Sequence, residues 1–352
     1  MSDIVTIVGA RPQFIKAAVV SKALMEVGIK EDIIHTGQHY DARMSEIFFE
    51  ELGIPTPVAN LEVGSGTHGA QTASMLAKTE SFLLEMPKKP AYVMVYGDTN
   101  STLAGALAAS KLGIKIIHIE AGLRSFNKSM PEEINRILTD RISDILFCSS
   151  ESGVRQLQKE GIVEGVHCSG DVMYDAINFF KKAAVENKDT RFSKPFVLLT
   201  LHRPATTDSY SKMVEVMNAI GHINMNVIWP VHPRVRKMLD KMTIPENLIL
   251  LEPLSYIEMI SALSKSYKLF TDSGGLQKEA YWLKKPCITL REETEWTETL
   301  TGNWNQITGT SSTKIQEAFQ NDPSTDWIAL YGDGNASGII ANIIKGELLK
   351  IH

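Results

Sequence analysis

Short apolar runs alternate with longer amphipathic segments along most of the chain. The run from Ile4 to Val8 is β-branched and breaks at Gly9, and residues 12–24 then place apolar side chains at helical spacing. The same unit of strand, turn and helix recurs, with further strands expected at residues 32–35, 91–96 and 114–119. Alternation of this kind requires crossover connections and therefore predicts a parallel sheet.

A second series of the same kind begins after Gly170, with strands expected at residues 196–201, 227–231, 248–251, 267–270 and 287–290. Two such series predict an α/β protein of two doubly wound domains, residues 1–169 and 170–337, which face each other across a cleft that is the default ligand site. Residues 338–352 have an amphipathic helix pattern with no strand after it. This helix fits either domain, and we assign it to the N-terminal one.

Length and composition agree with a two-domain globular protein. The 352 residues exceed the usual size of one hydrophobic core, and 43% hydrophobic with 22% charged residues is ordinary for a soluble globular protein. The net charge of −5 argues against nucleic-acid or membrane partners. The apolar run at the N-terminus is too short for a signal peptide, and three cysteines without CxxC spacing predict free thiols. We therefore expect a cytoplasmic protein without a metal site.

Charged residues gather between Gly97 and Arg136, where two predicted strands end. Asp98, Glu120 and Glu132 are candidate general bases, because burial or mutual repulsion raises the pKa of a carboxyl group. Asp98 has an alternative role as a helix cap, and an acidic residue in a first helical turn also suits the helix dipole. This helix-dipole role explains Glu133 better than it explains Glu132.

Two turns have the features of phosphate-binding sites. Arg11 and Lys16 flank the start of the first helix, where cations suit phosphate oxygens, although basic residues beside a turn are often only surface charges. The sequence lacks GxGxxG there, so a dinucleotide cofactor is poorly supported. Ser273-Gly274-Gly275 precedes a second helix and suits a diphosphate, or is only a turn. Glu279, one turn further, is placed to accept hydrogen bonds from ribose hydroxyls.

Three histidines end or occupy predicted strands. His202 and His232 each end a strand, beside Arg203 and Arg234. Such a histidine is commonly structural, but two of them next to arginines favour anion contact or proton transfer. His118 lies inside an apolar strand, so we interpret it as a core residue.

The chain closely resembles the non-hydrolysing UDP-N-acetylglucosamine 2-epimerases. The matching motifs run in family order from Gly9 to Ser337 and are GARPQFIK, TGQHYD, GDTNST, HIEAGLRS, MPEEINR, SGDVMYDA, LHRP, PVHPRV, TDSGGLQKEA and YGDGNAS. An ordered series over nearly the whole chain is far more specific than any single motif.

The resemblance implies the two-domain fold of GT-B glycosyltransferases and epimerisation at C2 of a UDP-amino sugar, without NAD or metal. A base removes the C2 proton, UDP leaves to give a 2-acetamidoglucal, and UDP adds back after C2 is reprotonated on the other face. By motif, the family's catalytic residues correspond to Asp98, Glu120, Glu132 and His202. The expected substrate or UDP contacts are Arg11, Lys16, Arg124, Arg136, Arg203, His232, Ser273, Gly274, Gly275 and Glu279. A homodimer serving surface polysaccharide synthesis is expected.

Departures from the family pattern bear on the substrate. Trp296, in TEW, replaces the arginine of the usual TERPE motif, and Leu254 replaces a glutamine. GARPQFIK with TEW resembles the branch that acts on UDP-2,3-diacetamido-2,3-dideoxyglucuronate. Its sugar carboxylate needs a cation, for which Arg124, Arg136 and Arg203 are candidates. Gln38 and His39, in TGQHYD, resemble part of an activating site for substrate.

Three alternatives stay open at this point. A hydrolysing epimerase would release free N-acetylmannosamine and UDP, but its sequences read GTRADFGK where this chain reads GARPQFIK. A GT-B glycosyltransferase would use Glu279 and the SGG turn in the same way, but it has no need of the three carboxylates. A UDP-sugar-binding module without activity is the last alternative.

Overall fold

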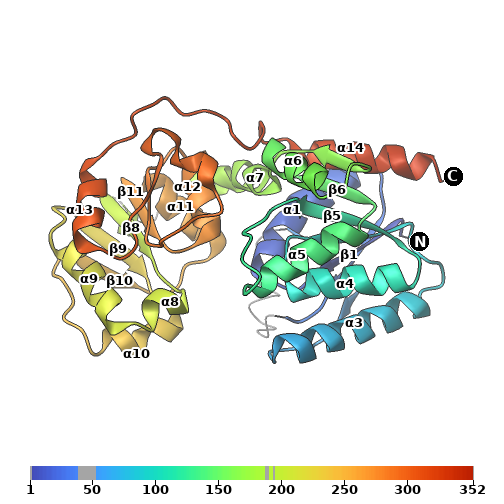
Figure 1. Cartoon of the computed structure of the whole chain (residues 1–352), viewed down its shortest axis with the longest axis horizontal. Helices are drawn as coiled ribbons and strands as arrows, with labels where there is room; N and C mark the ends of the chain where they lie inside the picture. The colour runs from blue at the N-terminus through green and yellow to red at the C-terminus, as the bar shows by residue number, and fades with distance from the viewer. Residues whose placement is uncertain (1, 39–52, 187–189, 193–194, 352) are drawn as a thin grey trace. The chain divides into compact units, whose positions relative to one another are not determined.

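The computed structural model describes residues 2–38, 53–186, 190–192 and 195–351. The chain forms two compact units, residues 1–176 with 331–352 and residues 177–330. Helix α7 (Val172–Glu186) carries the chain from the first unit into the second (Figure 1).

The first unit is built on a seven-stranded parallel sheet of order β3-β2-β1-β4-β5-β6-β7. Its strands are β1 (Ile4–Val8), β2 (Glu31–His35), β3 (Ala59–Asn60), β4 (Tyr92–Tyr96), β5 (Lys115–Ala121), β6 (Ile145–Cys148) and β7 (Val166–Cys168). β1 and β4 are buried at every position, as expected for apolar strands covered on both faces.

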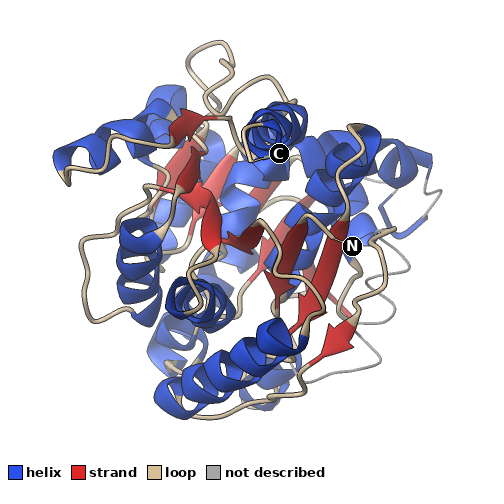
Figure 2. Cartoon of the chain, turned by 90° about the vertical axis from the view of Figure 1, so that its right-hand side faces the viewer, coloured by secondary structure: helices blue, strands red, loops and turns tan. Residues whose placement is uncertain are grey.

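Helices lie on both sides of this sheet, as Figure 2 shows. They are α1 (Arg11–Glu26), α3 (His68–Glu85), α4 (Asn100–Lys111), α5 (Pro131–Ile142), α6 (Glu151–Lys159) and α14 (Ala336–Leu349). Helix α14 packs against α1, so the C-terminal segment belongs to the first unit.

The second unit has a six-stranded parallel sheet of order β10-β9-β8-β11-β12-β13. Its strands are β8 (Phe196–Thr200), β9 (Asn226–Pro230), β10 (Leu248–Leu251), β11 (Lys268–Thr271), β12 (Cys287–Thr289) and β13 (Asn305–Ile307). Its α-helices are α8 (Pro204–Thr207), α9 (Tyr210–Gly221), α10 (Arg236–Leu239), α11 (Tyr256–Lys265), α12 (Gly274–Trp282) and α13 (Ser312–Gln320). Short 3₁₀ helices lie at η1 (Thr190–Phe192), η2 (Pro233–Val235) and η3 (Thr297–Asn303).

Both sheets have the strand order of a doubly wound nucleotide-binding domain, which confirms the expected fold class. The predicted strands agree with the observed ones to within about two residues, the usual uncertainty of a helix or strand boundary. The segment 233–242, PRVRKMLDKM, has a helix-like pattern in the sequence. In the structure it forms only η2 and the single turn of α10 before the chain reaches β10.

Candidate active site

Each sheet has one point at which the strand order changes direction, and ligands of doubly wound domains bind beyond the strand ends at this point. In the first unit it lies between β1 and β4, which lead into the turns at Gly9 and Gly97. In the second it lies between β8 and β11, which lead into His202 and Asp272. Most of the expected site residues therefore gather at one edge of each sheet.

Gly9 forms a tight turn between β1 and α1. A Cβ atom here would collide with the hydroxyl groups of Thr36 and Ser101, so the position requires glycine. The Oε1 atom of Gln13 accepts hydrogen bonds from the N–H groups of Gly9 (2.8 Å) and Ala10 (3.1 Å). These two N–H groups are therefore occupied, so the expected anion contact would have to come from the other N–H groups and the cations of α1.

Gln13 holds the two turns of this site together, and sequence analysis missed it although it lies inside the GARPQFIK motif. Its side chain is buried, and its Nε2 atom donates to the carbonyl oxygen of Tyr96 (2.9 Å) at the end of β4. Gln13 thus connects the Gly9 turn to the turn that carries Asp98. A polar residue on the inner face of an otherwise apolar helix was the available signal.

Lys16 and Glu120 form an ion pair, with side-chain exposures of 9% and 11%. Glu120 lies at an irregularity in the pairing of β5 with β6 and has a left-handed backbone, φ 72°. A non-glycine residue in this conformation costs free energy and is common at functional sites. A Cβ atom on Gly97 would lie 3.3 Å from the Glu120 Oε2 atom and 3.6 Å from the Lys16 Nζ atom. Three segments therefore converge on the Glu120 carboxylate.

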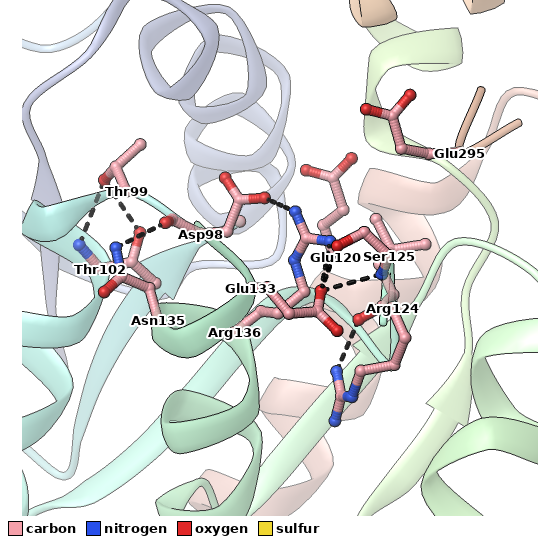
Figure 3. Close-up of polar contacts among 12 residues, drawn as sticks. Asp98, Thr99, Thr102, Glu120, Arg124, Ser125, Glu133, Asn135, Arg136 and Glu295 are labelled. Carbon is pink, nitrogen blue, oxygen red and sulfur yellow. Dashed lines mark hydrogen bonds and ion pairs between the residues drawn. The ribbon is translucent and has the colours of Figure 1, made fainter. Parts of the chain in front are cut away.

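Asp98 follows Gly97 and pairs with Arg136 of α5 (Figure 3). The Nδ2 atom of Asn135 also donates to the backbone carbonyl oxygen of Asp98 (2.9 Å). The cap of α4 is Thr99, whose side chain accepts from the N–H of Thr102 (3.3 Å), so the alternative role of Asp98 as the cap is wrong. The Asp98 carboxylate is one-third exposed beside the Glu120 site.

The two acidic residues that begin α5 differ completely in environment. Glu133 is buried and accepts hydrogen bonds from Ser125 and from the N–H of Phe126, and it pairs with Arg136 (3.0 Å). Burial would raise the pKa of Glu133, but these hydrogen bonds and the Arg136 charge hold the pKa below its usual value. Glu133 therefore fixes the loop before α5, a role beyond the helix-dipole alternative. Glu132 is half-buried and has no hydrogen-bond or ion-pair partner within the described parts of the chain.

Arg124 lies in a buried network rather than at the strand ends. Its guanidinium group donates to Asp140 (2.7 Å) and makes two hydrogen bonds to Glu160 (2.8 and 2.7 Å), and its side chain is 2% exposed. His118 is fully buried and contacts the same Asp140 carboxylate (2.7 Å), as expected for a core histidine. This arrangement gives no geometric support to Arg124 as a substrate contact.

In the second unit, His202 follows β8 and faces the buried carboxylate of Asp272. The His202 Nδ1 atom lies 3.2 Å from Asp272 Oδ1, and the N–H groups of His202 and Arg203 donate to the same carboxylate. A carboxylate on Nδ1 orients the imidazole and leaves Nε2 for proton transfer. Sequence analysis missed Asp272, which directly precedes the SGG turn.

The SGG turn begins α12, and the Ser273 side chain accepts from the N–H of Leu276 as its cap. A Cβ atom on Gly274 would lie 3.6 to 3.9 Å from side-chain atoms of Trp296, Glu295 and Arg203, whereas Gly275 faces open space. At Gly275 the start of this helix is thus open to a ligand. Glu279 is buried on the same helix.

A lysine side chain lies against the TEW segment, in which Trp296 replaces the usual arginine. The Nζ atom of Lys278 lies 3.8 Å from the centre of the Trp296 ring, within cation–π distance. Arg291 makes two hydrogen bonds to Glu295 (2.9 and 3.2 Å), while Arg203 is 3.8 Å from the same carboxylate. Burial would raise the pKa of Glu295, but Arg291 holds it below its usual value.

Two further expected residues follow strands, His232 in the second unit and Gln38 in the first. His232 follows β9, where partial burial lowers its pKa and the positive charges of His202 and Arg234 lower it further. Gln38 accepts from the N–H (3.1 Å) and hydroxyl (2.7 Å) of Ser101 at the start of α4. His39 lies outside the described residues, so the activating role of this pair stays a prediction.

No group of three or more potential metal ligands occurs within the described residues. Among the same residues, no helix combines the length and apolarity needed to cross a membrane.

Comparison with known proteins identifies the family. Residues 22–345 match the family model described as UDP-N-acetylglucosamine 2-epimerase. A UDP-N-acetylglucosamine 2-epimerase homolog of Methanococcus maripaludis is 50% identical, covering 97% of this chain and 99% of the relative. The UDP-2,3-diacetamido-2,3-dideoxy-D-glucuronate 2-epimerase of Pseudomonas aeruginosa is 47% identical over the same shares.

A solved structure extends the agreement to the fold. The UDP-GlcNAc 2-epimerase of Methanocaldococcus jannaschii, crystallised with UDP-GlcNAc and UDP, has a TM-score of 0.88 and 40% identity, covering 97% of this chain and 99% of that one. Sequence motifs, both sheets and the relatives agree: this chain belongs to the UDP-N-acetylglucosamine 2-epimerase family.

Proposed function

We propose that the chain inverts C2 of UDP-2,3-diacetamido-2,3-dideoxyglucuronate without hydrolysing it. Family membership makes the chain an isomerase of UDP-amino sugars, which decides against the glycosyltransferase and the inactive binding module. The sugar is the finer part of the proposal. It is supported by the 47% identity to the Pseudomonas aeruginosa enzyme and by Trp296 in place of the usual arginine.

The strained Glu120 is the observation that carries the proton-transfer assignment. Its carboxylate is pressed against Lys16 and Gly97 at the point where the strand order reverses, beside Asp98. Removal of a C2 proton next to an acetamido group needs a positioned base, and reprotonation on the other face needs an acid. We assign these tasks to Asp98, Glu120 and Glu132, of which Glu132 has no partner within the described chain.

His202 and the SGG turn are assigned to the UDP leaving group. Asp272 orients the His202 ring, so that Nε2 is available to a phosphate oxygen or a proton. The helix start at Gly274 and Gly275, which is open at Gly275, offers backbone N–H groups that stabilise charge developing on a diphosphate. Arg11 and Glu279 keep their proposed contacts with the nucleotide.

Arg203 is our candidate for recognising the sugar carboxylate. Arg124 and Arg136, the other two candidates, each bind two carboxylates and have side-chain exposures of 2% and 9%. The Arg203 side chain is 34% exposed, so its guanidinium group is accessible to a ligand.

Parallel incubation of the protein with UDP-GlcNAc and with the diacetamido-glucuronate in deuterated water tests both the identity of the sugar and the proton-abstraction mechanism. Proton NMR should show inversion and deuterium at C2 of the diacetamido sugar, with much slower turnover of UDP-GlcNAc. Preference for UDP-GlcNAc would refute the substrate, and inversion without deuterium would refute proton abstraction. Stoichiometric free UDP in phosphorus NMR would support the hydrolysing alternative.

A cytoplasmic homodimer completes the proposal. Ile134 and Leu138 are 47% and 45% exposed at i, i+4 spacing on α5, beside a depression lined by His68, Thr72 and Ala73. Neighbouring exposed apolar side chains are typical of protein interfaces. The three free cysteines suit a reducing compartment.

A further inference from the structure

The strained backbone at Glu120 is held on both sides by one buried group of residues. Gly97 donates its N–H to the carbonyl oxygen of Ile119 (2.9 Å), directly before Glu120. The Nε2 atom of His118 lies 2.8 Å from the carbonyl oxygen of Gly97. Gly97, the residue before Asp98, is therefore bound through both its N–H and its carbonyl oxygen to β5, the strand that carries Glu120.

Asp140 of α5 binds the chain on the other side of Glu120. Its carboxylate accepts from His118 Nδ1 (2.7 Å), from the N–H of Gly122 (3.2 Å) and from Arg124 (2.7 Å). His118 and Gly122 are the residues two before and two after Glu120. The Asp140 carboxylate thus binds the chain on both sides of Glu120, the residue with the left-handed backbone. Asp140 lies on α5, the helix that also carries Glu132 and Arg136.

The partners of the His118 ring are fixed by the geometry. A carbonyl oxygen can only accept, so the Nε2 atom donates to Gly97, while the Nδ1 atom faces the Asp140 carboxylate. Burial would raise the pKa of Asp140, but the hydrogen bond and charge of His118, with those of Arg124, hold it below its usual value. A fully buried charged group is costly to form, and apolar side chains at such positions commonly serve stability as well.

We propose that His118 and Asp140 are positioning residues for the epimerisation, which fix Glu120 and Asp98 relative to each other without touching the substrate. The inference rests on the proposed function of the Glu120 site. It assigns a role to a histidine that the sequence pattern marks only as a core residue. A group acting in this way controls the rate of proton transfer and leaves nucleotide binding intact.

His118→Gln tests the proposal, because an amide cannot bridge Gly97 and Asp140 as the ring does. We expect kcat and C2 deuterium exchange to fall together by about 100-fold, the usual effect of a displacement of about 1 Å. The KM and the Kd for UDP should change less than about threefold, since the SGG turn is untouched. Leu83→Ala is the matched control, because Leu83 is equally buried in the first unit, away from these strand ends.

Activity is compared at a temperature where circular dichroism shows every variant folded. A His118→Gln enzyme with wild-type kcat, or a Leu83→Ala enzyme with an equal loss, would overturn the inference. An inactive wild-type protein would instead refute the proposed function.

If His118→Gln does not fold, Arg124→Lys replaces it. This change removes the two hydrogen bonds to Glu160 but keeps a cation beside Asp140. We expect a several-fold loss of kcat at constant KM. A wild-type kcat would overturn the inference, and a raised KM with normal kcat would return Arg124 to the substrate contacts.

Discussion

Lys16 and Glu120 stand 104 residues apart in the sequence and form an ion pair in which both side chains are almost buried. The lysine comes from the second turn of α1 and the glutamate from the irregular end of β5. Asp98 makes a similar pair with Arg136. We expected burial or mutual repulsion to raise the pKa of these carboxyl groups, but Glu120 and Asp98 are each paired with a cation.

Glu120→Gln should abolish epimerisation while the protein remains folded. The amide keeps the size of the side chain but cannot take a proton, and loss of a general base typically costs about 10² to 10⁴ in rate. The rate of C2 deuterium exchange measures this directly. Glu62→Gln is the matched control, since Glu62 also has a left-handed backbone, φ 48°, in the same unit. Exchange at the wild-type rate in Glu120→Gln would remove Glu120 from the mechanism.

Asp272→Asn should lower kcat by about tenfold or more, because Asp272 orients the His202 ring. Loss of a residue that orients a catalytic side chain typically costs about 10- to 100-fold in activity. The N–H groups of His202 and Arg203 lose a charged acceptor as well. Steady-state kinetics check the result, with His222→Asn as control, because His222 bonds only locally to Asn218 within the described chain. An unchanged kcat would show that His202 needs no orienting carboxylate.

Arg203→Gln should reduce kcat/KM for the diacetamido-glucuronate by about 10- to 100-fold, the value of a charged hydrogen bond of about 1.5–3 kcal/mol. Turnover of UDP-GlcNAc, which has no sugar carboxylate, should change little. Competition between the two sugars measures the ratio. Arg236→Gln is the control, because Arg236 is half exposed and pairs with Glu252. Equal losses for both sugars would assign Arg203 to the UDP portion instead.

Glu133→Gln should destabilise the first unit by about 1–3 kcal/mol at pH 7, since Glu133 is a buried acceptor of charged and neutral donors. The pKa of Glu133 is lower in the folded state than in the unfolded state. Its contribution to the free energy of unfolding is therefore fully present above the unfolded-state pKa of about 4.3, and it is lost as the pH falls through the folded-state pKa. Thermal unfolding should therefore separate wild type and variant at pH 7 and bring them together in acid. A constant difference down to the lowest pH would contradict this linkage.

Ile134→Asp should convert the proposed dimer into a monomer, because it buries a charge in an apolar contact on α5. Light scattering after size-exclusion chromatography gives the mass. Val163→Asp, at a 67% exposed position of the same unit, should leave the mass unchanged. A monomeric wild type, or a dimeric Ile134→Asp variant, would refute this interface.

The sequence by itself did not reveal β3, β6, β7 and β13, four of the thirteen strands in the described chain. It determined the other nine strands and the positions of Asp98, Glu120, His202 and the SGG turn at strand ends. These features are local, because a buried strand or an amphipathic helix shows its period within a few residues. The tertiary structure decided the partners of each charge. Lys16 meets Glu120, and Arg124 turns inward to Asp140, because strand order brings distant segments together. Buried charges require such partners, and no periodicity within a segment can identify them.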